Sequence, residues 1–218
     1  MFIGHFAVAF AAKPVAPAVS LGTLFLACEW VDLVWPLFLF MGLERIEIRP
    51  GITAFTPLDF VHYPWTHSLA MCAAWAVGLG LLYLLVRRDR GAALVVGAVV
   101  LSHWLLDLIV HRPDLPLTPG GEARWGLGVW NSIPATIAIE GALFVLALGF
   151  YLRHTRALDR IGRWGLYALI AFLLVAYVGA AFGPPPPSVE AIAWAGLIGG
   201  AITALLGYWI DSHRAAAA

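Results

Sequence analysis

Six apolar stretches of this chain are each long enough to cross a lipid bilayer as a helix. They lie at about 18–42, 65–86, 91–111, 130–152, 161–182 and 189–210, each bounded by charged residues, Pro or Gly. A helix rises about 1.5 Å per residue, so roughly 20 apolar residues span the hydrocarbon core. Backbone groups in lipid must be satisfied within the protein, and the alternating pattern of a membrane barrel is absent. The sequence therefore predicts an all-α, polytopic transmembrane bundle with about six spanning helices.

Composition favours one membrane domain. Hydrophobic residues make up 61% of the 218 residues and charged residues only 12%, which is more apolar surface than a soluble domain of this size can cover. We expect residues 1–214 to form a single integral membrane domain in contact with the bilayer, followed by an alanine tail at 215–218. The thirteen basic and thirteen acidic residues cancel, and no long basic run is present, which excludes a nucleic-acid binder. The sequence does not indicate an oligomeric state.

The first apolar segment, residues 2–12, is too short to span and is followed by Pro14 and Pro17. We therefore expect a short N-terminal re-entrant helix. The Arg-rich segments at 87–90 and 153–163 fall on one side of the predicted topology, together with Lys13 and Arg214. Because cytoplasmic loops are enriched in Lys and Arg, this side is predicted to be cytoplasmic, with both termini on it.

Ionisable side chains inside the predicted spans need a partner or a function, because burying them in lipid costs several kcal/mol by most estimates. Glu29 and Asp32 lie in the first long span, three residues apart and hence on one helix face. No Arg lies inside any predicted span to neutralise them. This pair therefore favours a metal-binding or proton-transfer role.

Two further clusters contain histidine. His62 and His67 lie near the start of the second span, and His103 and Asp107 lie one helical turn apart in the third. His5 and Glu140 are single ionisable residues in the first segment and the fourth span. The predicted topology places these groups between the middle of the membrane and its outer surface, so we expect one shared site.

Imidazoles combined with carboxylates suit Zn²⁺, Mn²⁺ or Fe²⁺. The predicted ligands are His5, Glu29, Asp32, His62, His67, His103 and Asp107. This set could hold two divalent ions, or one ion with an outer shell of hydrogen-bonding carboxylates. His111 is as readily explained by packing, and Glu140 by a hydrogen bond to a neighbouring helix.

Over about residues 1–115 these motifs resemble a family of predicted bacterial membrane-bound metal-dependent hydrolases, which includes LexA-regulated inner-membrane proteins. The matching features are an N-terminal His, an acidic pair, a His-x4-His-Ser block at 62–68 and a later His-x3-Asp at 103–107. The family pattern has Pro-Asp-x-Asp at the acidic pair, so Glu29 replaces its first acid, and it has an Arg after the first His of the block, where this chain has Tyr63. The resemblance implies metal binding and a bacterial inner-membrane location.

The sequence therefore leads to the hypothesis of a metal-dependent hydrolase in which metal-activated water attacks an ester or phosphoester, including a lipid-linked one. Glu140 or Glu29 is the expected general base. Two other hypotheses use the same residues. One is a metal-ion or proton transporter or channel, which requires a polar route to the cytoplasmic face. The other is a structural membrane protein in which a closed ligand set holds a metal as a staple.

Overall fold

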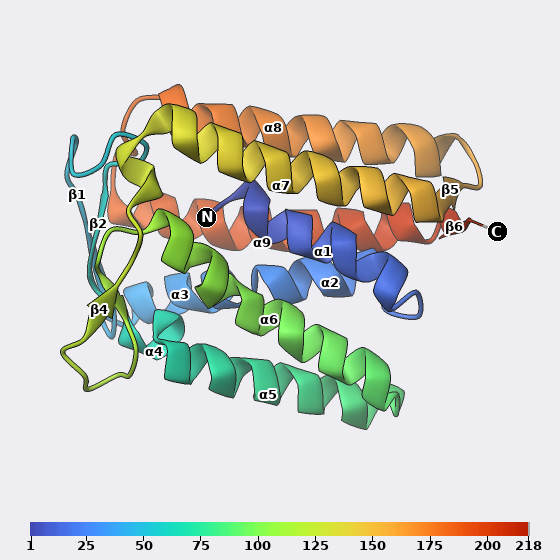
Figure 1. The fold of residues 1–218 in the computed structure, drawn as a ribbon, viewed down its shortest axis with the longest axis horizontal. Helices are drawn as coiled ribbons and strands as arrows, with labels where there is room; N and C mark the ends of the chain where they lie inside the picture. Colours follow the sequence, from blue (N-terminus) through green and yellow to red (C-terminus); the bar gives the residue numbers. More distant parts are fainter. Residues whose placement is uncertain (218) are drawn as a thin grey trace.

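Most of the chain is helical in the computed structural model, which describes residues 1–217 (Figure 1). The helices are α1 Ile3–Val15, α2 Leu21–Cys28, α3 Trp30–Phe40, α4 Pro64–His67, α5 Leu69–Arg87, α6 Arg90–Val110, α7 Ile133–His154, α8 Leu166–Phe182 and α9 Val189–Asp211. A 3-10 turn, η1 Val129–Asn131, precedes α7, and a π-helical turn, η2 Ile161–Gly165, precedes α8. The predicted all-α bundle is confirmed.

Short strands lie at both ends of the bundle. They are β1 Arg45–Ile48, β2 Leu58–His62, β3 Leu115–Pro116, β4 Arg124–Trp125, β5 Thr155–Ala157 and β6 Arg214–Ala216. They form three antiparallel pairs, β1–β2, β3–β4 and β5–β6. In these pairs, backbone N–H and C=O groups of the connecting segments form hydrogen bonds outside the helices.

Five of the helical segments are long and apolar enough to cross a membrane: α5, α6, α7, η2 with α8, and α9. The stretch predicted as a single span at 18–42 is instead the pair α2 and α3, which meet at a bend of 49°. The bend lies at Glu29, whose φ and ψ of −97° and 3° end one helix and begin the next. If the bent pair counts as one span, the number of candidate spans reaches the predicted six.

Serine and aspartate caps explain why most helix starts lie close to their predicted positions. Ser68, Asp89, Ser132 and Ser188 each accept a hydrogen bond from a backbone N–H in the first turn of α5, α6, α7 and α9. Such side chains satisfy N–H groups that have no partner inside the helix. The start of each span is therefore fixed by a local interaction that is visible in the sequence.

The connections sort to the two ends of the bundle as the predicted topology requires (Figure 1). One end carries the α5–α6 turn, the α7–α8 connection and β6. The other carries β1 and β2, the segment between α6 and α7, and the α8–α9 loop. Met1 is the exception, because it is buried inside the bundle instead of lying at the end that carries the C-terminal strand. Helix α1, of 13 residues, is too short to cross, and it runs from the interior to that end.

Helix α1 occupies the middle of the bundle and packs against α2, α6 and α7. Phe6 and Phe10 of α1 make edge-to-face contacts with Phe25 of α2, with ring centroids 5.1 and 5.3 Å apart. Such aromatic pairs stabilise a buried interface beyond the area that they cover. This packing holds α1 against α2, and the first turn of α1 carries His5 into the polar cluster.

Candidate metal centre

Five predicted ligands from four helices converge in the interior of the bundle. Helix α6 supplies His103 and Asp107, whose spacing of four residues places both side chains on one face. His5 comes from α1, Asp32 from the first turn of α3 and His67 from the end of α4. These side chains form two groups that could each hold a metal ion and that share His103.

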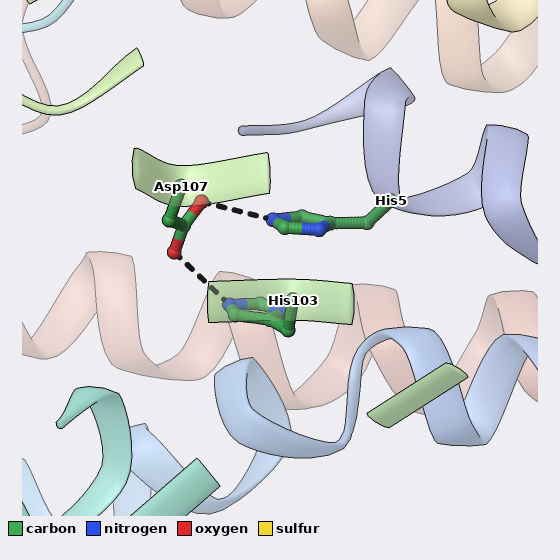
Figure 2. A group of neighbouring side chains, drawn as sticks. All are labelled: His5, His103 and Asp107. Carbon is green, nitrogen blue, oxygen red and sulfur yellow. Dashed lines mark ion pairs between the residues drawn. The ribbon is translucent and has the colours of Figure 1, made fainter. Parts of the chain in front are cut away.

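The first group comprises His5, His103 and Asp107, all buried (Figure 2). The two imidazole rings stack with centroids 3.8 Å apart. Oδ1 of Asp107 lies 3.2 Å from His5 Nε2, and Oδ2 lies 3.2 Å from His103 Nε2. The same Oδ1 also accepts a hydrogen bond from the amino group of Met1. Asp107 therefore links the two histidines, because each of its carboxylate oxygens faces a different ring.

The second group comprises Asp32, His67 and His103. Oδ1 of Asp32 lies 3.2 Å from His67 Nε2 and 3.6 Å from His103 Nε2. Oδ2 of Asp107 is also near, at 4.0 Å from His67 Nε2. Nε2 of His67 and Nε2 of His103 thus each lie within 4.0 Å of a carboxylate oxygen of Asp32 and of one of Asp107.

Hydrogen bonds on the far side of the His67 and His103 rings determine which ring nitrogen faces the two carboxylates. Nδ1 of His103 lies 3.0 Å from the carbonyl oxygen of Cys28, which can only accept, so Nδ1 carries the proton. Nε2 of a neutral ring then presents a lone pair. That atom is buried and has no hydrogen-bond partner among residues 1–217. Metal-binding histidines are commonly oriented in this way by a carbonyl or carboxylate behind the ring.

His67 is oriented by a relay that begins at Glu44, in the segment between α3 and β1. The Thr66 hydroxyl donates to Glu44 Oε2 at 2.7 Å and lies 2.7 Å from His67 Nδ1. Because the hydroxyl proton is directed to Glu44, the hydroxyl accepts from Nδ1–H, which leaves the Nε2 lone pair facing Asp32. Oε1 of Glu44 also accepts from the backbone N–H groups of Trp65 and Thr66. All the hydrogen bonds of this buried carboxylate thus stabilise the short helix that carries His67.

The resulting arrangement can hold a positive charge at its centre. When both rings are neutral, each Nε2 lone pair faces carboxylate oxygens 3.2 to 4.0 Å away, and a cation between them removes the resulting repulsion. Two imidazoles with two carboxylates are a donor set that suits Zn²⁺, Mn²⁺ or Fe²⁺. The residues present therefore fit a divalent metal ion.

Three residues predicted for the site lie outside both groups. His62 is exposed at the end of β2, opposite Arg45, because the extended backbone of β2 carries it away from the helix that holds His67. Glu29 lies on the wall of a nearby cavity. Glu140 is buried in α7, and its Oε2 accepts from the backbone N–H groups of Phe2 and Gly4 at 2.9 and 3.2 Å, so it caps the start of α1. Glu140 is thus placed to hold α1, and it does not line the cavity.

The structure adds His111, which sequence reasoning left with a packing role. Its ring is buried, with Nδ1 3.0 Å from Asp114 Oδ1 and Nε2 3.8 Å from Asp107 Oδ2. Asp114 also accepts from Tyr63 Oη and Arg112 Nε, each at 2.9 Å. Burial lowers the pKa of His111. The spacing of four from Asp107 to His111, and of three from His111 to Asp114, was the available sequence signal.

A cavity of about 790 Å³ adjoins the second group. Asp32, His67, Asp107 and His111 line it at one end, together with Glu29. Two members of the second group, Asp32 and His67, line the cavity, whereas Asp107 is the one member of the first group that does so. A ligand in the cavity could therefore reach the second group directly.

Comparison of the chain with family models, with curated proteins and with solved structures finds no match.

Proposed function

We propose that this protein is a membrane-embedded, metal-dependent hydrolase that acts on an ester or phosphoester. The observation that carries the proposal is that Asp32 and His67, which line a cavity, form with His103 a group of side chains that could hold a metal ion. Asp32, His67 and His103 would hold the ion, and Asp107 Oδ2 lies beside them, 4.0 Å from His67 Nε2 and 3.2 Å from His103 Nε2. The motif resemblance to predicted bacterial membrane-bound hydrolases supports the same activity. When bound, a divalent ion such as Zn²⁺, Mn²⁺ or Fe²⁺ would polarise the bond to be broken and favour ionisation of a nearby water.

The chain itself supplies a proton-transfer group. Nδ1–H of His111 donates to Asp114, so its Nε2 lone pair faces the site from the cavity wall. A neutral imidazole oriented by a carboxylate can accept a proton from an attacking water and return it to a leaving oxygen. Glu29, on the same wall, is the second group that can accept a proton there. His111 takes the place that the sequence had suggested for Glu140.

The bundle around the site argues against transport. On the other side of the first group, the interior is filled by the side chains of Phe6, Phe10, Phe25 and Tyr151, all less than 3% exposed. Phe10 packs against Tyr151 with centroids 5.2 Å apart. These aromatic side chains fill the interior at that level, where a polar route to the cytoplasmic face would have to pass. A purely structural metal is disfavoured because the ligands adjoin a cavity, whereas structural sites are usually closed.

The orientation of the protein follows from its charges. The end of the bundle that carries the α5–α6 turn and the α7–α8 connection holds Arg-rich segments at 87–90 and 153–163. Cytoplasmic loops are enriched in such residues. We infer that this end faces the cytoplasm of a bacterium and that the cavity opens toward the outer face of its inner membrane.

The direct test is the metal content of detergent-purified protein, measured by elemental mass spectrometry alongside hydrolysis of 4-nitrophenyl esters and phosphoesters. We expect about one or two equivalents of Zn, Mn or Fe, and their loss in His67→Ala and Asp107→Ala. His154→Ala is the control, because His154 lies at the far end of α7 and bonds the carbonyl oxygen of Phe150. Absence of metal from wild-type protein, even after reloading, would overturn the proposal.

A further inference from the structure

The ionisable residues that line the cavity lie at its metal-centre end, and the rest of its lining is mostly apolar. Away from that end its walls come from α3, α8, α9 and the segment between β1 and β2. The side chains along α8 and α9 are apolar or small, with Thr203 as the exception; examples are Phe172, Leu173 and Ile192. A ligand that fills this space must therefore combine a polar group at the metal centre with an apolar body along α8 and α9.

Small residues on α8 and α9 leave open space at the level of the cavity. A methyl group added at Gly179 of α8 or at Gly199 of α9 would meet no atom within 4 Å, although both residues line the cavity. The space beside these glycines is thus open. A larger side chain at either position would extend into it without disturbing the backbone.

The same wall is exposed on the outside of the bundle. Phe172 is 45% exposed, and Gly179, Ala180 and Gly196 are exposed as well, although all four line the cavity. The cavity can therefore be reached from the side, between α8 and α9. Both helices belong to candidate membrane spans, so the medium outside this opening is the lipid bilayer.

We propose that this cavity binds the hydrocarbon chain of a membrane lipid ester, which enters between α8 and α9 with its ester group directed to the metal centre. Cleavage of the ester rests on the proposed hydrolase function, but binding of the hydrocarbon chain in the cavity can be tested separately. Ligand pockets commonly have volumes of about 300 to 1,000 Å³, and the cavity of about 790 Å³ lies within that range. A sixteen-carbon chain needs roughly 480 Å³ if each carbon group occupies ~30 Å³, which is the volume of one water molecule in the liquid. The cavity can hold one such chain together with the ester group.

The test uses the full-length protein in detergent micelles and palmitic acid that carries a photoactivatable diazirine near the end of its chain. Cross-linked peptides are identified by mass spectrometry in wild type, Gly199→Leu and Gly149→Leu. Gly149 is the matched control, because it is also a half-buried helical glycine whose added methyl group would meet no atom within 4 Å, yet it does not line the cavity. Gly179→Leu serves as a second cavity variant if Gly199→Leu does not fold.

We expect saturable labelling of the cavity-lining parts of α3, α8 and α9, reduced roughly tenfold in Gly199→Leu and unchanged in Gly149→Leu. Non-saturable labelling spread over all the spans, equal in the three proteins, would overturn the inference.

The two proposals fail in different ways. Saturable labelling of the cavity without hydrolysis of 4-nitrophenyl palmitate or of a phospholipid would leave the lipid site standing and count against the hydrolase. Hydrolysis of 4-nitrophenyl acetate and palmitate at equal rates, without labelling of the cavity, would support the hydrolase and overturn the lipid site.

Discussion

Helices α1–α6 provide the side chains of the candidate metal centre, whereas helices α8–α9 provide the wall of the cavity beside it. The first region provides every side chain of the two candidate metal groups. The second contains no His, Cys, Asp or Glu except Glu190 and Asp211, which lie at the two ends of α9. It forms instead the apolar wall of the cavity. Side-chain chemistry is thus concentrated in one part of the chain, whereas the space for a ligand depends on the shape of another.

The largest effect is expected from a change at His103, the residue common to both candidate groups. Its replacement in His103→Gln removes the Nε2 donor from each group and should abolish both bound metal and hydrolysis. Elemental mass spectrometry and ester hydrolysis measure this, with circular dichroism to confirm that α6 is still folded. If His103→Gln keeps its full metal content, the ion is held elsewhere and the first region does not carry the site.

A smaller effect is expected at the cavity wall, where His111 is held by Asp114. In His111→Gln, hydrolysis should fall by about 10²- to 10⁴-fold, the usual contribution of a proton-transfer group, because the side chain can no longer accept a proton. Metal content should stay near that of wild type. Simultaneous loss of metal would instead identify His111 as a ligand.

The next effect concerns the relay behind His67. In Glu44→Gln the Thr66 hydroxyl loses its charged acceptor, so the orientation of the His67 ring is less strongly fixed. Changes of this kind typically weaken metal binding by about 10- to 100-fold. Competition with a chelator of known affinity measures the change. Glu47→Gln is the control, because Glu47 lies on the exposed side of β1 and pairs only with Arg49 among the described residues.

The smallest effect is expected at His62, which the family resemblance suggested as a ligand and which is exposed on β2. His62→Ala should leave metal content unchanged and alter the free energy of unfolding by no more than about 0.5 kcal/mol, as is usual for surface positions. Loss of metal in this variant would show that β2 moves toward the centre when the ion binds.

Local spacing explains why part of the site could be predicted. His103 and Asp107 share a helix face whatever the rest of the chain does, and the predicted topology placed His67 and Asp32 at the same depth. Glu44 could not be found in this way, because its role depends on a contact across 22 residues of chain with Thr66. His62 and His67 are close in sequence, but β2 and α4 are different elements and separate them.

The sequence by itself determined that this chain is a membrane bundle, and it fixed most helix starts within a few residues. Both follow from local causes, namely the length of the apolar stretches and the caps that satisfy the first turns. Only the tertiary structure decided that the first long span bends at Glu29, that Glu140 caps α1, and that a cavity lies between α8 and α9. These features depend on contacts between helices distant in sequence, where the size and shape of neighbouring side chains determine the packing.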